Sequence, residues 1–274
     1  MEIQRQVMKY GSEIEEVLHQ PTPCAELEKE EKVYAMMDGA MILTRESGWK
    51  EVKLGRVFKE KSLHSENEKR NWIRSSEYVG HLGDHKSFEN KFSQVIDKYE
   101  RLKNNLVFIN DGARWIWKYI DAEFPNATQI LDYYHAVEHL SSFGKLYFFK
   151  KQSKAFKDWL EEIKVLLKVK GIDEVLGEIK ALKQKTATVE QERRKLIAYC
   201  ERNKKRMDYP KFIKKGLLIG SGAIEAAHRT VTQKRLKLSG QRWSINGAQN
   251  VINLRTLNMS GRWNVIHSKL RKIA

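Results

Sequence analysis

The sequence predicts a mixed α/β fold in which a block of helices is inserted late in the chain. Short apolar stretches rich in β-favouring residues recur up to about residue 134, and helical patterns lie between them. From residue 136 to about residue 215 the apolar spacing is helical only. The 274 residues, 41% hydrophobic and 31% charged, suffice for one large domain or for a domain with a sizeable insertion.

The first half of the chain supplies the expected sheet. Residues 1–30 predict a short helix followed by a loop, because acidic and polar residues there lead into two prolines. After them we expect strands at 32–44, 51–59 and 77–82, a helix at 84–102, a strand at 106–109, a helix at 113–124 and a strand at 128–134. This last strand would run directly up to His135.

The second half begins with the helical block. Its first stripe of apolar residues, which includes Phe156, Ile163 and Leu167, ends at Gly171. A break rich in glycine follows Pro210, and after it comes a helix that carries Glu225. This order of elements resembles the topology of a ribonuclease-H-like core, with the helices inserted before its last element. The predicted divisions are an N-terminal segment 1–30, a first core part 31–135, the insertion 136–215, and a final helix with a basic segment 216–274.

Positive charge is concentrated at the end of the chain. The formal net charge is +16, from 51 Lys and Arg against 35 Asp and Glu. No acidic residue follows Glu225, whereas the last 49 residues carry ten basic ones. Trp243 and Trp263 lie among these cations, a combination typical of nucleic-acid surfaces, where cations meet phosphates and rings stack on bases. A solubilising basic tail with core tryptophans is the alternative.

Other classes of protein are excluded or disfavoured by composition. No stretch approaches the roughly 20 apolar residues of a transmembrane helix, and the N-terminus lacks the apolar core of a signal peptide. Cys24 and Cys200 form neither a disulfide framework nor a zinc cluster. We therefore expect a cytoplasmic protein with reduced thiols.

Three carboxylates are candidates for a metal site. In a ribonuclease-H-like core the first and fourth strands are neighbours, so Asp38 and Asp111 would lie close together. Glu225, on the later helix, could complete the site. Two divalent cations about 3.5–4 Å apart activate a water and relieve charge on the leaving oxygen during phosphodiester cleavage. Mg²⁺ prefers such oxygen ligands.

Each of these acids also has an ordinary structural interpretation. Asp38-Gly39 between two apolar runs is typical of a type I′ hairpin turn, and the pair considered alone favours that turn. Asp111-Gly112 resembles a strand-to-helix loop in which Asp111 caps the helix. Glu225 and Arg229, four residues apart, could form a surface pair.

A zinc site is a competing interpretation. His135, Glu138 and His139 form the H-x-x-E-H pattern of inverted zinc peptidases. A third ligand would have to come from a later acid, with Glu161, Glu162 or Glu225 as the candidates. The expected strand up to residue 134 puts His135 at a helix start, and a peptidase leaves the basic segment unexplained, so we disfavour this function.

Several strings of the sequence resemble those of bacterial DDE transposases of the Kra-type insertion-sequence family. In order, they are MMDGAMI (36–42), NDGARWIW (110–117), FPNATQILDYYHAVEHL (124–140), GSGAIEAAHR (220–229), KRLKLSGQRWS (234–244) and a Gly-Ala-Gln-Asn to Asn-Leu-Arg stretch (247–255). They cover most of residues 31–265 in the order of the family. The chain is similar to the catalytic part of such enzymes, a group that we take to share its core plan with Mutator-like transposases.

The resemblance implies metal-dependent cleavage and strand transfer at insertion-sequence ends. Asp38, Asp111 and Glu225 would bind two Mg²⁺ ions, for which Mn²⁺ can substitute, with Asp38 bridging both. Asp132 and His135 match the (C/D)xxH signature of Mutator-type enzymes and would be auxiliary. The residues expected to contact DNA are Arg229, Lys234, Arg235, Lys237, Arg242 and Trp243. The expected partners are transposon ends, target DNA and further copies of the chain, with no membrane, in a nucleoid-associated cytoplasmic protein.

The sequence departs from the family at its front. Only about thirty residues precede the first expected catalytic strand, whereas family members usually carry a longer region thought to recognise the transposon ends. We therefore expect a truncated transposase that retains its catalytic part. A catalytically impaired DNA-binding remnant and a ribonuclease-H-like nuclease that cuts without joining are the alternatives.

Overall fold

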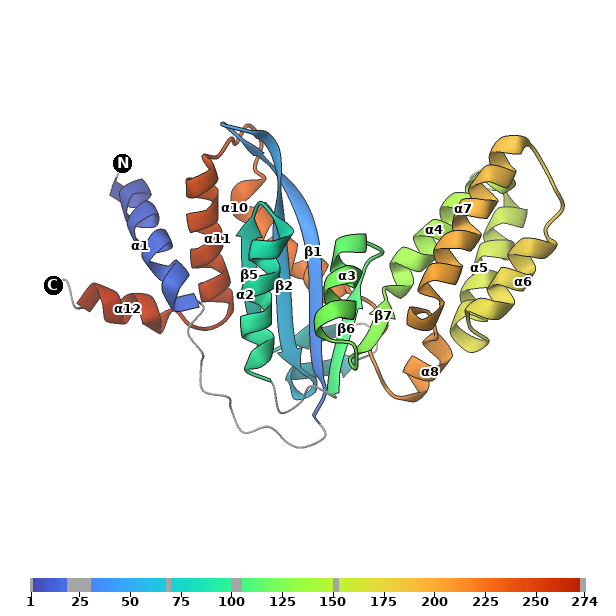
Figure 1. Cartoon of the computed structure of the whole chain (residues 1–274), viewed down its shortest axis with the longest axis horizontal. Helices are drawn as coiled ribbons and strands as arrows, with labels where there is room; N and C mark the ends of the chain where they lie inside the picture. Colours follow the sequence, from blue (N-terminus) through green and yellow to red (C-terminus); the bar gives the residue numbers. More distant parts are fainter. Residues whose placement is uncertain (1, 19–30, 68–69, 100–104, 150–152, 272–274) are drawn as a thin grey trace. The chain divides into compact units, whose positions relative to one another are not determined.

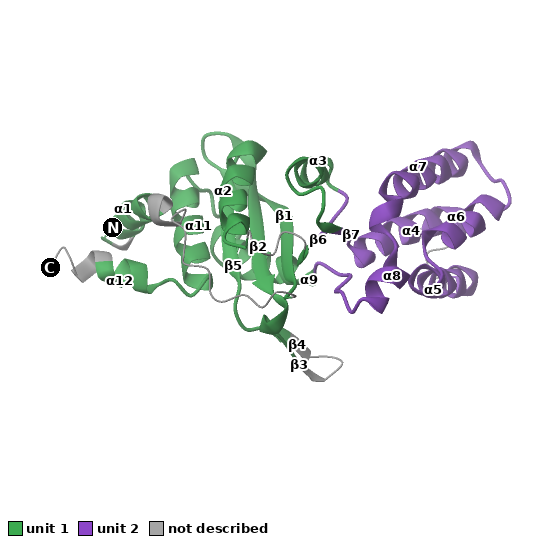
Figure 2. Ribbon diagram, turned by 60° about the horizontal axis from the view of Figure 1, so that its bottom comes forward, with its two compact units in different colours: residues 1–108, 113–128, 222–274 green, residues 109–112, 129–221 purple. Residues whose placement is uncertain are grey.

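The computed structural model describes residues 2–18, 31–67, 70–99, 105–149 and 153–271. The chain divides into two compact units, which are coloured in Figure 2. Unit 1 comprises residues 1–108, 113–128 and 222–274, and unit 2 comprises residues 109–112 and 129–221. The architecture is mixed α/β, as the sequence predicts.

A five-stranded mixed sheet is the central element of the fold (Figure 1). Its strands are β1 (Val33–Thr44), β2 (Gly48–Lys59), β5 (Glu77–Leu82), β6 (Leu106–Asn110) and β7 (Thr128–Leu131), in the spatial order β5-β2-β1-β6-β7. β2 is antiparallel to both β1 and β5, and β1 is parallel to β6. The sequence did not predict the separate hairpin of β3 (Leu63–Asn67) and β4 (Arg70–Ile73).

The interpretation of Asp38-Gly39 as a hairpin turn is wrong. β1 runs without a break through both residues, and Asp38 pairs with Leu54 of β2. The turn lies further on, where the Thr44 hydroxyl donates to the carbonyl of Gly48 at 2.7 Å. Gly48 adopts a φ of +66°, a conformation that glycine reaches without the steric cost of a Cβ.

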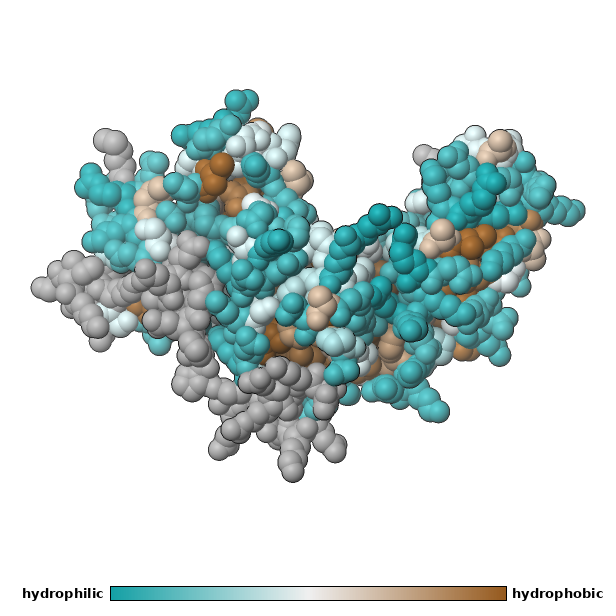
Figure 3. All heavy atoms as spheres, in the orientation of Figure 1, coloured by the Kyte–Doolittle hydropathy of each residue, from teal (hydrophilic) through white to brown (hydrophobic). Residues whose placement is uncertain are grey.

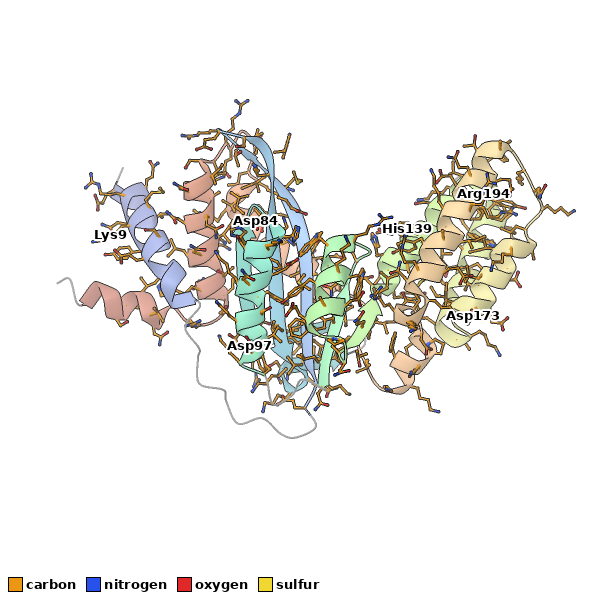
Figure 4. The ribbon with its side chains drawn as sticks, in the orientation of Figure 1. Lys9, Asp84, Asp97, His139, Asp173 and Arg194 are labelled. Atoms are coloured by element: carbon orange, nitrogen blue, oxygen red, sulfur yellow. The ribbon has the colours of Figure 1, made fainter. Side chains whose placement is uncertain are left out.

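Helices of unit 1 cover the sheet and extend beyond it (Figure 1). They are α1 (Glu2–Leu18), α2 (His85–Asp97), α3 (Arg114–Glu123), α9 (Gly222–His228), α10 (Lys234–Leu236), α11 (Ile245–Met259) and α12 (Asn264–Arg271), together with a 3-10 turn η1 (Glu60–Ser62) and a π-helical segment η4 (Arg229–Gln233). Asp84 (Figure 4) is the N-cap residue of α2, and its side chain accepts a hydrogen bond from the backbone N–H of Ser87. This bond lowers the pKa of Asp84 to about 2.

The core of unit 1 joins the sheet to α11. Ile42 and Leu82 from the strands pack with Leu236 and Ile252 in one buried cluster. On its other side α11 packs against α1, where the Asn253 side chain donates to the carbonyl of Gly11 at 3.0 Å. Burial of these apolar faces stabilises the unit.

Unit 2 is built from helices. They are α4 (Tyr133–Tyr147), α5 (Lys154–Val169), α6 (Ile172–Ala181), α7 (Ala187–Asn203) and α8 (Tyr209–Lys214), with a 3-10 turn η3 (Lys204–Arg206). The predicted stripe of Phe156, Ile163 and Leu167 is buried on α5. Figure 3 shows hydrophilic residues over most of the visible surface of each unit. None of the helices in the described ranges has the length and apolar character needed to cross a bilayer.

The strand predicted at 128–134 ends early, at Leu131. Asp132 stops it because its side chain accepts a hydrogen bond from the backbone N–H of His135 at 2.9 Å and caps α4. Tyr133 and Tyr134 are therefore helical. His135 lies in the first turn of α4, in agreement with its expected place at a helix start.

Candidate functional site

Asp38 lies in the middle of β1 with a partly accessible side chain. Its side chain is 33% exposed, although the first five residues of the strand are buried. One carboxylate oxygen accepts a hydrogen bond from the backbone N–H of Gly39 at 2.7 Å. A rigid strand therefore presents a carboxylate at the border of the core.

Helix α9 is fastened to the sheet by a buried arginine. Arg56 of β2 donates from Nη1 to the carbonyl of Ala223 at 2.8 Å, in the first turn of α9, and from Nε to the Ser76 hydroxyl at 2.9 Å. The guanidinium lies 5.2 Å from the ring centre of Tyr78. Burial lowers the pKa of Arg56. Because Arg56 holds Ala223, the turn of α9 that carries the exposed Glu225 is fixed against the sheet.

His228 connects α9 to Asp38 directly. It is three residues after Glu225, so the two side chains lie on neighbouring positions of one helical face. The imidazole is 3% exposed, and its Nε2 lies 3.6 Å from Oδ2 of Asp38. Nε2 has no hydrogen-bond partner among the described residues, whereas Nδ1 lies 3.2 Å from the Thr232 hydroxyl. Burial lowers the pKa of His228, which favours the neutral ring.

The structure thus brings the helix of Glu225 to the strand of Asp38 inside unit 1. Glu225 makes no ion pair with Arg229 in the described part of the chain, so the predicted surface pair is not formed. Sequence reasoning missed Arg56 and His228. The string GSGAIEAAHR contains His228, but nothing in its spacing indicates that this histidine faces a distant strand.

Asp111 belongs to unit 2 and directly follows β6. The interpretation of Asp111 as the N-cap residue of α3 is wrong, because the N-cap residue of that helix is Ala113. Gly112 lies against Tyr199 of α7, where a Cβ would approach the tyrosine oxygen to 2.8 Å. Tyr199 is largely buried, and burial raises its pKa.

Asp132 joins three segments of unit 2. Its backbone N–H donates to the carbonyl of Asn110 at 2.8 Å, and its Oδ1 caps α4. Its Oδ2 accepts from the backbone N–H of Ser221 at 2.5 Å and from the Ser221 hydroxyl. Ser221 is the residue before α9 in the sequence. With 2% exposure, Asp132 is a structural carboxylate that holds the residues next to Asp111 and the chain that enters α9.

The two histidines of the H-x-x-E-H pattern face each other on α4 (His139 is labelled in Figure 4). Their Nε2 atoms are 3.3 Å apart, and His139 packs on the ring of Tyr199 with centres 4.2 Å apart. Burial, and then the neighbouring His135, lower the pKa of His139. Glu161, one of the acids considered as a third zinc ligand, forms an ion pair with Lys164 at 2.6 Å.

Side chains that could bind a metal ion are scattered rather than clustered in the described ranges. These ranges contain no group of three or more His, Cys, Asp or Glu side chains arranged to hold a metal ion. The donors of Asp38 and Glu225 are nevertheless of the type that Mg²⁺ prefers, because both are carboxylates with access to solvent.

The residues predicted to contact DNA lie in unit 1 after α9. Five of them are exposed cations, Arg229, Lys234, Arg235, Lys237 and Arg242. Trp243 is half-buried against the cluster that contains Ile42 and Leu236. Comparison of the chain with models of known protein families gave no match, and comparison with curated protein sequences gave none either.

Proposed function

We propose that the chain is a DDE-type DNA transposase that cleaves DNA at insertion-sequence ends and joins the freed strand to a target. The observation that carries the proposal is the seating of α9 on the sheet, with His228 against Asp38 and Glu225 three residues before it on the same helix. Two of the three predicted acids are thereby held in one unit by buried contacts of Arg56.

The third acid follows from strand register. β1 and β6 are parallel, and the last pair of their ladder is Ala35 with Phe108. Asp38 comes three residues after Ala35 within β1, and Asp111 comes three residues after Phe108, directly behind the end of β6, so the proposal expects these carboxylates to be neighbours. Residues at corresponding positions of two adjacent parallel strands lie side by side, so the proposal expects the two carboxylates to share an ion.

The sheet order supports the same proposal at the level of fold. Numbered along the chain within the five-stranded sheet, the strands lie in the order 3-2-1-4-5, and the second is antiparallel to the first. A ribonuclease-H-like core has this arrangement, and we propose that fold for the chain. Fold alone does not define an activity, so the carboxylates must carry the functional argument.

In the proposed mechanism Asp38, Asp111 and Glu225 would hold two Mg²⁺ ions, and the ions would supply activation of the attacking oxygen and charge stabilisation of the leaving one. By the resemblance, Asp38 would be the acid shared by both ions, with Asp111 and Glu225 each completing the ligands of one ion. Arg56 fixes α9, and through it Glu225. The reaction first hydrolyses a phosphodiester at a transposon end, which frees a 3′-OH, and then joins that 3′-OH to a target phosphate. The exposed cations after α9 would neutralise nearby phosphates. The resemblance implies that further copies of the chain assemble on the DNA.

The test uses the full chain with labelled DNA that spans the flanks of its own gene, in Mg²⁺ or Mn²⁺. Strand-transfer product that disappears in Asp38→Asn and persists in Glu174→Gln supports the proposal; Glu174 is an exposed acid of α6. Cleavage without joining indicates a nuclease instead. DNA that is bound but never cut indicates a remnant without catalysis. Activity that survives Asp38→Asn contradicts the assigned site.

A further inference from the structure

Unit 1 contains a cavity of about 930 Å³ between α1, the β1–β2 turn and the chain after α9. Four arginines contribute to its lining, Arg45, Arg235, Arg242 and Arg255, and no Asp or Glu among the described residues does. Two tryptophans, Trp243 and Trp263, and several aliphatic side chains complete it. Its volume is near the upper end of the range of ligand sites in proteins.

The arginines of this cavity carry charge that the described part of the chain does not neutralise. None of the four forms an ion pair among the described residues. Arg45 donates from Nε to the carbonyl of Arg242 at 3.2 Å, and Arg255 donates to the carbonyls of Thr230 and Val231. These bonds use only some of the five N–H groups of each guanidinium. Burial and the nearby Arg235 lower the pKa of Arg255, so an anion that enters here relieves repulsion between cations.

The tryptophans give the cavity flat walls. Trp243 is fixed, because its backbone N–H donates to the carbonyl of Leu43 at 3.1 Å and its carbonyl accepts from Arg45 at 2.9 Å. Its side chain packs against the buried cluster around Ile252. Trp263 is 40% exposed and lines the same cavity. Aromatic faces beside arginines suit a ligand that has both flat bases and phosphates.

A π-helical segment links this cavity to Glu225. Residues Arg229–Gln233 form wider turns than an α-helix, and such segments are frequent at functional sites. Arg255 caps two carbonyls of this segment, which then continues into α10 with Arg235. Glu225 and Arg235 are ten residues apart on this continuous helical run, about 15 Å along its axis at the α-helical rise. A DNA strand cut at Glu225 therefore has its neighbouring nucleotides within reach of the cavity.

We propose that this cavity binds an unpaired nucleotide at the end of a DNA strand, with its phosphates on the arginines and its base against Trp263 and Trp243. DNA as the ligand rests on the proposed function. An unpaired nucleotide fits better than a base pair, because a duplex hides the faces of its bases in the stack and a pocket reaches them only after extrusion. A free nucleotide or inorganic phosphate shares part of this chemistry, and the experiment separates these sources.

The experiment measures binding of the full chain in EDTA, so that no cleavage occurs. The probes are a blunt duplex and the same duplex with a three-nucleotide 3′ single strand that carries 2-aminopurine. We expect the overhang to raise affinity about tenfold, since stacking of a base contributes on the order of 1–3 kcal/mol. We also expect 2-aminopurine fluorescence to be quenched on binding.

Variants assign this preference to the cavity. Trp263→Ala and Arg242→Ala change partly or fully exposed side chains and should abolish the quenching and most of the tenfold preference. The matched controls are Trp49→Ala and Arg194→Ala, which change exposed residues outside the cavity and should keep both. Equal affinity for the two duplexes, or a preference unaffected in Trp263→Ala, overturns the proposal.

Competition identifies the source of the ligand. If dAMP or inorganic phosphate displaces the overhang at its own binding concentration, the cavity is a small-anion site and the proposal is wrong. The test of the cavity and the test of the transposase can fail independently of each other. Cleavage without overhang preference refutes the cavity alone, and overhang preference in a chain that never cuts DNA leaves the cavity standing and refutes the transposase.

Discussion

The cavity of unit 1 and the helices of unit 2 differ in how they balance positive charge. On the helices of unit 2 lysines lie beside acids, as in the pairs Lys164–Glu161 at 2.6 Å and Lys195–Glu192 at 2.6 Å. The arginines around the cavity of unit 1 have no such partners among the described residues. Exposed ion pairs contribute little to stability. Those of unit 2 mainly neutralise the charge of a solvated surface. If the proposed cavity function holds, these arginines are a surface that an external anion would complete.

Acids of the two units should differ most in their effect on catalysis. Glu225→Gln removes an expected metal ligand of unit 1 and should reduce strand transfer to below detection. Glu161→Gln removes an exposed acid of unit 2 that pairs with a lysine, and activity should stay unchanged. Gel assays of joined product measure both. A fully active Glu225→Gln variant would remove the contrast between the units.

The next largest effect concerns the fastening of α9. Arg56→Met leaves the Ala223 carbonyl and the Ser76 hydroxyl without their partner. A hydrogen bond to a charged group contributes about 1.5–3 kcal/mol, so we expect the free energy of unfolding to fall by about that amount. Urea titration measures it, with Arg194→Met on the exposed face of α7 as the control. Equal stability of the two variants would show that Arg56 does not hold the helix.

Unit 2 has its own buried fastening at Asp132. In Asp132→Asn one of the two side-chain oxygens becomes an NH₂ group, which cannot accept the hydrogen bonds of a carboxylate. We expect the free energy of unfolding to fall on the order of 1–3 kcal/mol, measured by urea titration. Ser221→Ala removes only the hydroxyl bond and should cost less, because the backbone N–H of Ser221 still donates. If Ser221→Ala is the more damaging change, the backbone bond is not the main contact.

A smaller effect is expected in the salt dependence of DNA binding. Replacing Lys234, Arg235 and Lys237 by Ala should lower the slope of log K against log salt by about 0.9 for each phosphate that the variant no longer neutralises. The control replaces the exposed lysines Lys157, Lys170 and Lys183 of unit 2. Similar slopes for both triple variants would mean that the cations of the two units are equivalent for DNA.

Sequence patterns predict the elements of both units better than the contacts between distant elements. The stripe of Phe156, Ile163 and Leu167 specifies α5, because helical periodicity is local. Asp38-Gly39 leads to a wrong turn prediction. An Asp-Gly pair favours a turn locally wherever it stands, including inside a long strand such as β1. Whether these two residues form a turn or a strand depends on their pairing with β2. That strand lies further along the chain, outside the window of a local pattern.

Of the residues in the candidate site, only the acids can be predicted from the sequence. Asp38 and Glu225 are identifiable from strings and from a resemblance, and the structure places their elements together in unit 1. His228 and Arg56 escape sequence reasoning because their role depends on packing between α9 and the sheet. The position of Arg56 inside the apolar run 54–58 is the signal that could have indicated it, since a charge buried there needs partners.

The smallest expected effect concerns the thiol of Cys200 in unit 2. Cys24 lies outside the described residues, whereas Cys200 is a free, buried cysteine of α7. Burial raises the pKa of Cys200 to about 12, so at a pH of about 8 almost all of it is the unreactive thiol. Iodoacetamide labelling followed by mass spectrometry should modify Cys200 slowly in the native chain and rapidly in urea. Asp132→Asn should accelerate native labelling by shifting the opening equilibrium of unit 2, whereas Arg56→Met in unit 1 should accelerate it less. Equal acceleration by both variants would show that the units unfold together, and the contrast between them would then be one of charge alone.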